Sequence, residues 1–281
     1  MTPASFTLIT GIVRQRSGGV IAQDQAYMLE TRLAGLLKRE GLRGLDALAD
    51  RLRQPRNEAL AQEVTELLTT NESSFFRDGK PFEHLRALIP RLHAARPPGQ
   101  RLRIWSAACS TGQEAYSIAI LLAEMAAADP GLRTRPVEIL GTDITAAVLE
   151  RARAGVFTQF EVQRGLPIRT LMQRFTQEAG RWRIRPEIAA PCRFERFNLL
   201  DDLRPLGRFD VIFCRNVLIY FDVPTMARVL NAIAGMLAPD CVLYLGASET
   251  ALGITTSLVA LPGERAVSRA ASAAEPARLR A

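Results

Sequence analysis

The sequence predicts an α/β fold, a doubly wound parallel sheet, preceded by an all-α N-terminal domain. Three observations support this prediction. The stretch Arg101–Ala123 passes directly from an apolar run to a helical pattern, residues 1–95 carry apolar side chains at helical spacing, and polar residues end several later apolar runs. Strands buried in a parallel sheet form continuous apolar runs and are joined by helices, so this order is typical of an open α/β sheet.

The composition is that of a globular protein. A chain of 281 residues, 48% of them hydrophobic, provides for one large or two modest domains. No apolar run reaches the length of a membrane span, and Met1-Thr2-Pro3 begins no signal peptide, so we expect a cytoplasmic protein that is not inserted in a membrane. The formal net charge of +7 suggests acidic partners, but it does not distinguish nucleic acid from an acidic protein surface.

The four cysteines and two histidines do not form a metal-binding pattern. Cys109, Cys192, Cys214 and Cys241 are far apart, and three of them fall inside strand-like runs, so we expect buried free thiols. The two histidines occur in one predicted helix, away from any acidic cluster. We therefore expect no disulfide framework and no bound metal.

The strongest linker signal divides the chain at Arg96-Pro97-Pro98-Gly99. Residues 1–95 are the predicted helical domain, with helices near 2–15, 23–39, 44–53, 57–68 and 81–95. Residues 96–269 are the predicted α/β domain. The tail 270–281, rich in alanine, is expected to be disordered.

The first predicted strand, Leu102–Ala108, runs into the turn Cys109-Ser110-Thr111-Gly112, and a helix follows from about Gln113 to Ala127. Both Ser110-x-x-Gln113 and Thr111-x-x-Glu114 fit the capping box that opens a helix. A strand, a small-residue turn and a helix N-terminus form the part of an open sheet that binds nucleotide-like ligands.

The composition of this turn limits which class of ligand it can bind. Gly112 is its only glycine and no lysine follows, which counts against a dinucleotide site and excludes a P-loop. S-adenosylmethionine carries a carboxylate and an ammonium group but no phosphate, so it tolerates such a turn and can use a carboxylate such as Glu114. The alternative is that Glu114 only caps its own helix.

Two further segments have both a ligand-binding and a structural interpretation. The second strand, Val137–Thr142, ends in Asp143, which could accept the ribose hydroxyls of an adenosine ligand or cap the next helix, 145–153. The polar loop Asn71–Asp78 contains two aromatic residues. From the residues alone we favour an interhelical turn, in which Asn71 or Ser73 caps a helix and the aromatic rings fill the core.

Residues 155–196 are unusual for a doubly wound sheet. A helix at 168–176 and short alternating pieces at 182–184 and 192–197 suggest a small β elaboration beside the main sheet. Its arginines are Arg164, Arg169, Arg174, Arg181, Arg183, Arg185, Arg193 and Arg196. Such a cluster is either a solvated face or a docking surface.

The remaining pattern completes the sheet. A third strand ends at 197–200, and a fourth, Phe209–Cys214, places Arg215 and Asn216 at its carboxyl end, where open sheets bind ligands. A helix at 224–237, a fifth strand at 241–247 and a hairpin near 257–268 follow.

Six motifs, in this order, resemble one family, the CheR-type glutamate methyltransferases of chemotaxis receptors. They are T-N-E-S-S-F-F-R at 70–77, W-S-A-A-C-S-T-G-Q-E-A-Y-S-I-A at 105–119, G-T-D-I at 141–144, F-E-V-Q-R-G-L-P at 160–167, N-L-L at 198–200 and C-R-N-V-L-I-Y-F at 214–221. The helical N-terminal region also fits. The resemblance implies a Rossmann-like methyltransferase sheet with a small β subdomain at 155–196 used in receptor docking.

The resemblance also implies a cofactor, S-adenosylmethionine, released as S-adenosylhomocysteine. Its implied binding residues are Asn71, Ser73, Arg77, Ala107, Gly112, Glu114, Asp143, Asn198, Leu199, Arg215 and Asn216. Arg77 and Tyr220 are the implied catalytic residues. The first motif thereby becomes part of the site rather than a simple interhelical turn.

The implied reaction methylates glutamate side chains on the cytoplasmic coiled coil of methyl-accepting chemotaxis receptors. We expect a monomer that does not bind nucleic acid. The alternative is a nucleic-acid methyltransferase, suggested by the positive charge, although R-N-V-L stands where an N-P-P-Y-like motif would follow the fourth strand. A nicotinamide-dependent oxidoreductase is a further alternative, but this chain lacks the glycines that its cofactor site requires. A non-catalytic binding module would not need Arg77 and Tyr220.

Overall fold

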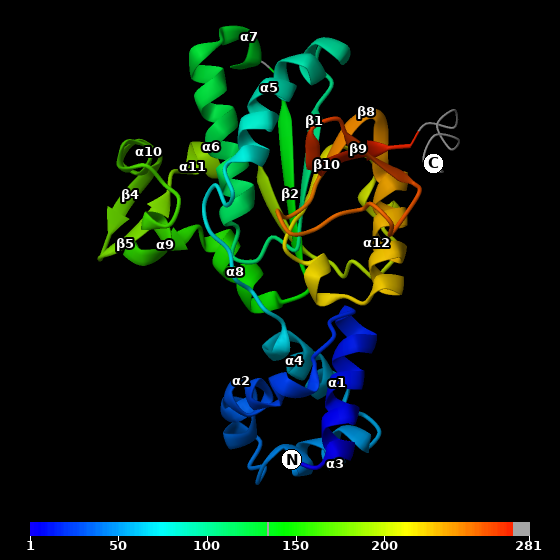
Figure 1. The fold of residues 1–281 in the computed structure, drawn as a ribbon. Coiled ribbons are helices and arrows are strands. Elements are labelled where there is room, and N and C mark those ends of the chain that lie inside the picture. The colour runs from blue at the N-terminus through cyan, green and yellow to red at the C-terminus, as the bar shows by residue number, and fades with distance from the viewer. Residues whose placement is uncertain (134, 272–281) are drawn as a thin grey trace. The chain divides into compact units, whose positions relative to one another are not determined.

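The computed structural model describes residues 1–133 and 135–271 and contains two compact units (Figure 1). One unit comprises Met1–Thr70 with Tyr220–Met226, and the other comprises Asn71–Ile219 with the chain from Ala227 onward. The observed division therefore falls at Thr70 and not at the linker near residue 96. Most of the predicted tail, 272–281, lies outside the described residues, and Ala270 ends a strand.

The first unit is helical, as predicted. Its elements are α1 (Pro3–Ser17), the 3₁₀ helix η1 (Gln23–Gln25), α2 (Ala26–Arg39), α3 (Leu45–Arg53) and α4 (Glu58–Leu68). One apolar face of each α-helix enters a common core that includes Ile9, Leu29, Leu33, Leu48 and Val64. Arg32 closes the end of α4, where its guanidinium donates to the carbonyls of Leu68 and Thr69 at 3.0 Å each.

The second unit is built on a seven-stranded sheet with the order β6-β2-β1-β7-β8-β10-β9. Its strands are β1 (Leu102–Ala107), β2 (Val137–Asp143), β6 (Cys192–Arg196), β7 (Phe209–Cys214), β8 (Leu237–Tyr244), β9 (Leu258–Leu261) and β10 (Glu264–Ala270). The pairs from β6 to β8 are parallel, and β10 is antiparallel to both its neighbours. This confirms the predicted fold class, an all-α region followed by a mostly parallel α/β sheet.

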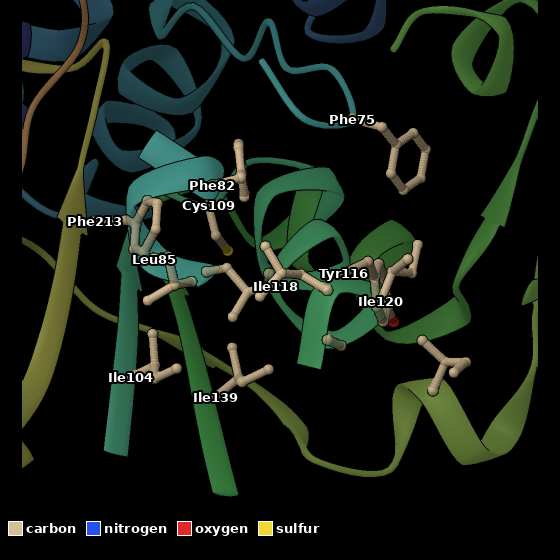
Figure 2. Packing of buried hydrophobic residues seen from close by; sticks show 14 of the residues in the cluster. Phe75, Phe82, Leu85, Ile104, Cys109, Tyr116, Ile118, Ile120, Ile139 and Phe213 are labelled. Carbon is tan, nitrogen blue, oxygen red and sulfur yellow. The ribbon is translucent and has the colours of Figure 1, made fainter. Parts of the chain in front are cut away.

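Helices cover the sheet. The helices α5 (Lys80–Ala95) and α6 (Gln113–Ala128) pack on one face, where Phe82 and Ile118 meet Ile104, Ile139 and Phe213 (Figure 2). Figure 1 shows α12 (Val223–Met236) on the opposite side of the sheet. Because α5 buries its apolar face against this sheet, it belongs to the second unit and not to the helical unit in which the sequence placed it. The short helix α7 (Pro130–Arg133), α8 (Ala146–Ala154) and the 3₁₀ helices η2 (Arg204–Leu206) and η3 (Leu218–Tyr220) lie in the connections.

A small subdomain of three antiparallel strands, ordered β3-β5-β4, follows α8. It contains β3 (Val156–Phe157), α9 (Gln159–Gln163), α10 (Ile168–Arg174), β4 (Phe175–Glu178), β5 (Arg181–Ile184) and α11 (Pro186–Ala189). Two predictions here were wrong. The helix expected to reach residue 176 ends at Arg174, because the next residues pair with β5, and Cys192–Arg196 is the edge strand of the main sheet, in register with Ile139–Asp143.

That register also corrects the third strand of the main sheet, which ends at Arg196 and not at 197–200. The cysteines Cys109, Cys192, Cys214 and Cys241 are free, as expected, and only Cys192 is partly exposed. Over residues 1–133 and 135–271, no helix is both long and apolar enough to cross a membrane.

Candidate active site

Loops at the carboxyl ends of β1, β2, β7 and β8 share one edge of the sheet, because these strands are neighbours and parallel. These loops carry the turn 108–112, Asp143, Arg215 and a second turn, 246–249. Open α/β sheets bind ligands at this edge. Most of the predicted site residues of the second unit therefore converge on one place.

The turn after β1 departs from regular backbone at several positions. Ala108, Ser110 and Gly112 have φ of 53°, 52° and 91°. A Cβ on Gly112 would lie 3.0 Å from the Cβ of Ala152, so glycine is needed here for its left-handed backbone and for close packing. Gly112 contributes to the site by shaping the turn.

Both predicted capping boxes are wrong. Gly112 is itself the N-cap residue of α6 and makes no side-chain capping bond, and the Thr111 hydroxyl donates to the side chain of Gln113 at 2.7 Å. Glu114 does not cap its own helix, because its carboxylate oxygens bond to Ser106 and Arg215.

Asp143, the last residue of β2, joins two loops. Its carboxylate accepts from the backbone N–H of Ser110 and of Thr145, each at 2.9 Å. Thr145 is the N-cap residue of α8, so Asp143 is not that cap. Burial raises the pKa of the Asp143 carboxyl. The residue is placed to fix the turn after β1 and retains lone pairs for a further donor.

Arg215 is the centre of a buried ionic cluster, with a side chain only 1% exposed. Its Nη1 donates to Glu114 at 2.9 Å, and its Nη2 donates to the Arg77 carbonyl at 2.8 Å and to the Asp78 carboxylate at 2.7 Å. Ser106 donates to the second oxygen of Glu114 at 2.7 Å. Within the part of the chain that the structure describes, the buried Nε of Arg215 has no hydrogen-bond partner.

The loop Asn71–Asp78 lies against this cluster and is held along its length. The Asn71 carbonyl accepts from the Ser110 hydroxyl at 2.8 Å, and the Phe76 N–H donates to Ser117 at 2.9 Å. The left-handed φ of Phe76 and Asp78, 46° and 66°, shows that tertiary contacts override local preference. Gly79 is the N-cap residue of α5, so neither Asn71 nor Ser73 caps that helix.

The same loop is packed against the small subdomain. The Phe75 ring is 1% exposed and meets Phe157 and Phe175 edge-on, at centroid distances of 5.0 and 5.6 Å. A Cβ on Gly165, which has φ of +100°, would lie 1.9 Å from the Phe75 carbonyl oxygen. The first motif and F-E-V-Q-R-G-L-P therefore meet backbone to backbone.

The other predicted site residues are placed as follows. Ala107 ends β1 and is buried, and Leu199 is buried beside the partly exposed Asn198 beyond the end of β6. Asn216 follows Arg215 in a left-handed conformation, and the Arg77 guanidinium reaches back to the Glu72 carbonyl at 3.4 Å.

Tyr220 falls in the other unit, where its carbonyl accepts from the Val20 N–H at 2.8 Å. Its catalytic role therefore stays a prediction.

Sequence reasoning missed several supporting residues. Ser106, Ser110, Ser117, Asp78 and Glu249 bond the site residues or the loops that carry them. Glu249 left a signal that the sequence analysis did not use, a carboxylate just beyond the fifth strand. Over residues 1–133 and 135–271, no group of three or more histidine, cysteine, aspartate or glutamate residues could hold a metal ion.

Two family profiles match this chain. Residues 71–267 match the S-adenosylmethionine (SAM) binding domain of the CheR methyltransferases, and residues 4–69 match their all-α domain. The fold, the site and this match define an S-adenosylmethionine-dependent methyltransferase. The chain belongs to the CheR methyltransferase family.

Named relatives agree with this assignment. The chain is 39% identical over 248 residues to chemotaxis protein methyltransferase 1 of Pseudomonas aeruginosa, covering 88% of this chain and 90% of that protein. It is 38% identical to chemotaxis protein methyltransferase Cher2 of Pseudomonas putida, covering 84% and 86%. It is also 38% identical to the chemotaxis protein methyltransferase of Vibrio parahaemolyticus, covering 86% and 88%.

Proposed function

We propose that this protein methylates glutamate side chains of methyl-accepting chemotaxis receptors in the cytoplasm, with S-adenosylmethionine as the methyl donor. The family and the names of its relatives support this proposal. The cofactor site is proposed on a single observation. Arg215, just after β7, and Glu114, in the first turn of α6, form a buried pair, and the Arg215 Nε has no partner among the described residues.

The charges of this pair match the methionine end of the cofactor. The unpartnered Nε of Arg215 is a donor for its carboxylate, and Glu114 is an acceptor for its ammonium group. Asp143 is assigned to the ribose hydroxyls, and Asn198 with Leu199 to the adenine. We further assign Asn71, Ser73, Arg77, Ala107, Gly112 and Asn216 to the wall of this site.

When bound, S-adenosylmethionine supplies a methyl group on a positively charged sulfur and leaves as S-adenosylhomocysteine. The acceptor carboxylate, with an ordinary pKa of about 4.3, is already ionised at neutral pH, so the chain needs no general base. Its task is to position the acceptor and stabilise charge. We assign Arg77 to hold one oxygen of the acceptor carboxylate and Tyr220 to a second contact.

Positive charge supports an acidic protein as the acceptor. The net charge is +7, and Arg169 and Arg181 are exposed on the small subdomain. This surface suits the acidic cytoplasmic coiled coil of a receptor. We expect the protein to act as a monomer, and we place nucleic acid second, since no N-P-P-Y-like motif follows β7.

Arg77→Ala and Tyr220→Phe are expected to lower turnover more than they weaken the affinity for S-adenosylhomocysteine. Loss of a group that contacts the reacting atoms typically costs about 100-fold or more in kcat for a charged donor, and less for a hydroxyl. Initial rates and calorimetric titration measure the two quantities. Arg91→Ala and Tyr27→Phe, at exposed positions, are the matched controls. Equal turnover in variants and controls would remove both residues from the mechanism.

The product distinguishes the proposed acceptor from its alternatives. Receptor-containing membranes and nucleic acid would be incubated separately with the protein and S-adenosylmethionine labelled in the methyl group. A glutamyl methyl ester releases volatile methanol in mild alkali, whereas a methyl group on an amine, amide or nucleobase stays attached. We expect alkali-labile label on the receptor. Alkali-stable label, or label on nucleic acid alone, would contradict the proposal.

A further inference from the structure

We propose that Glu249 is a positioning residue for methyl transfer: its buried carboxylate holds the loop after β7 in the shape that presents Arg215 and Asn216. This inference rests on the proposed function of that loop. Glu249 follows β8 in the turn 246–249 and is 7% exposed. Neither the motifs that define the site nor the ionic cluster of Arg215 includes it.

Among the described residues, the carboxylate is held by backbone N–H groups alone. One oxygen accepts from Asn216 at 2.8 Å and from Gly246 at 2.6 Å, and the other accepts from Ile219 at 3.2 Å. Within the described residues it forms no ion pair. A buried charge without a counterion is costly, and amide dipoles offset that cost only if they point at it together. The carboxylate therefore determines where these three N–H groups lie.

The three N–H groups come from two loops. Asn216 and Ile219 lie in the loop that follows β7, and Gly246 lies just beyond β8, its parallel neighbour. Glu249 also closes its own turn, since its N–H donates to the Gly246 carbonyl at 2.9 Å. One side chain thus ties together two loops at the ligand-binding edge of the sheet.

The contacts of Glu249 also support left-handed backbone next to Arg215. Asn216 has φ of +57°, a left-handed conformation that asparagine tolerates better than most residues other than glycine but still adopts infrequently. A Cβ on Gly246 would lie 2.7 Å from the Glu249 carboxylate, 2.8 Å from the side-chain Nδ2 of Asn216 and 3.0 Å from its backbone nitrogen. Gly246 thus leaves the space in which the carboxylate and Asn216 meet. Losing the tie would let Asn216 relax and shift Arg215 beside it.

Two variants test this role in different ways. Glu249→Gln keeps the size but turns an NH₂ group toward at least one backbone N–H. Gly246→Ala keeps the carboxylate charged but displaces it. Glu187→Gln, at an exposed glutamate, and Gly235→Ala, where a Cβ would meet nothing within 4 Å, are the matched controls.

The readouts are melting temperature, calorimetric affinity for S-adenosylhomocysteine, kcat, and hydrogen exchange of the amides of 216, 219 and 246. Calorimetry and exchange need no acceptor, so they remain informative if the proposed receptor substrate is wrong. We expect slow exchange at all three amides in the unmodified protein. At a temperature where both variants are folded, we expect affinity and kcat to fall about tenfold or more, with faster exchange at these amides.

Several results would overturn the proposal. Normal affinity and kcat in both folded variants would show that Glu249 serves stability alone. Fast exchange of the Asn216 and Ile219 amides in the unmodified protein would show that no tie exists, even if neither variant folds. If the control variants lost as much affinity and kcat as the test variants, the losses would not be specific to Glu249, and the proposal would be wrong.

Discussion

Gly165→Ala is expected to lower methyl transfer about 100-fold and to destabilise the second unit by about 3 kcal/mol. The added Cβ would lie 1.9 Å from the Phe75 carbonyl oxygen, at a residue with φ of +100°. The neighbour is backbone, so the loop 71–78 must move as a whole. A shift of about 1 Å in a positioning group can cost a factor of about 100 in rate. Overpacking adds about 1–3 kcal/mol and the left-handed backbone about 1–2 kcal/mol.

Gly180→Ala separates these two causes. Gly180 lies in the turn between β4 and β5, has φ of +76°, and a Cβ there would meet nothing within 4 Å. It therefore reports the backbone strain without the clash. We expect Gly180→Ala to lose some stability, measured by denaturant unfolding, while its kcat stays near normal. If Gly165→Ala behaved no worse than Gly180→Ala, the close approach to Phe75 would have no functional importance.

Arg215→Met is expected to abolish measurable binding of S-adenosylhomocysteine and to cost about 3–5 kcal/mol of stability, the usual penalty for removing one partner of a buried ion pair. Methionine fills much of the space but leaves Glu114 and Asp78 without their cation. The estimate falls toward its lower end, because the Asp78 side chain is 35% exposed and water can reach it. Calorimetry and denaturant unfolding measure the two effects.

The matched control for Arg215→Met is Arg204→Met. Arg204 also pairs with a carboxylate, that of Asp202, but its side chain is 88% exposed. Removing an exposed pair changes stability by only about 0–1 kcal/mol. If Arg215→Met and Arg204→Met had the same free energy of unfolding and the same affinity for S-adenosylhomocysteine, the buried cluster would have no role in cofactor binding.

The order of strands and helices could be predicted from the sequence, because the spacing of apolar residues within a short segment indicates whether that segment is a helix or a strand. The mainly apolar segments Leu102–Ala107 and Phe209–Cys214 are both central parallel strands. The predictions failed where the partner of a segment decides its role. Cys192–Arg196 alternates like a peripheral strand, yet it joins the main sheet because β2 offers it a free edge. The sequence of α5 has the same apolar spacing as the helices before it, but its apolar face packs against the sheet.

For the site, the sequence by itself determined which loops carry functional residues, because polar residues at the end of a buried strand must lie at one edge of the sheet. The sequence did not decide whether Glu114 and Asp143 cap helices or bind a ligand, since the same local pattern is compatible with both roles. The tertiary structure decided against capping in both cases. Arg215, which follows β7 far along the chain, binds Glu114, and Thr145 rather than Asp143 is the N-cap residue of α8. The contact of Gly165 with Phe75 and the tie made by Glu249 join residues distant in sequence, and no local periodicity encodes them.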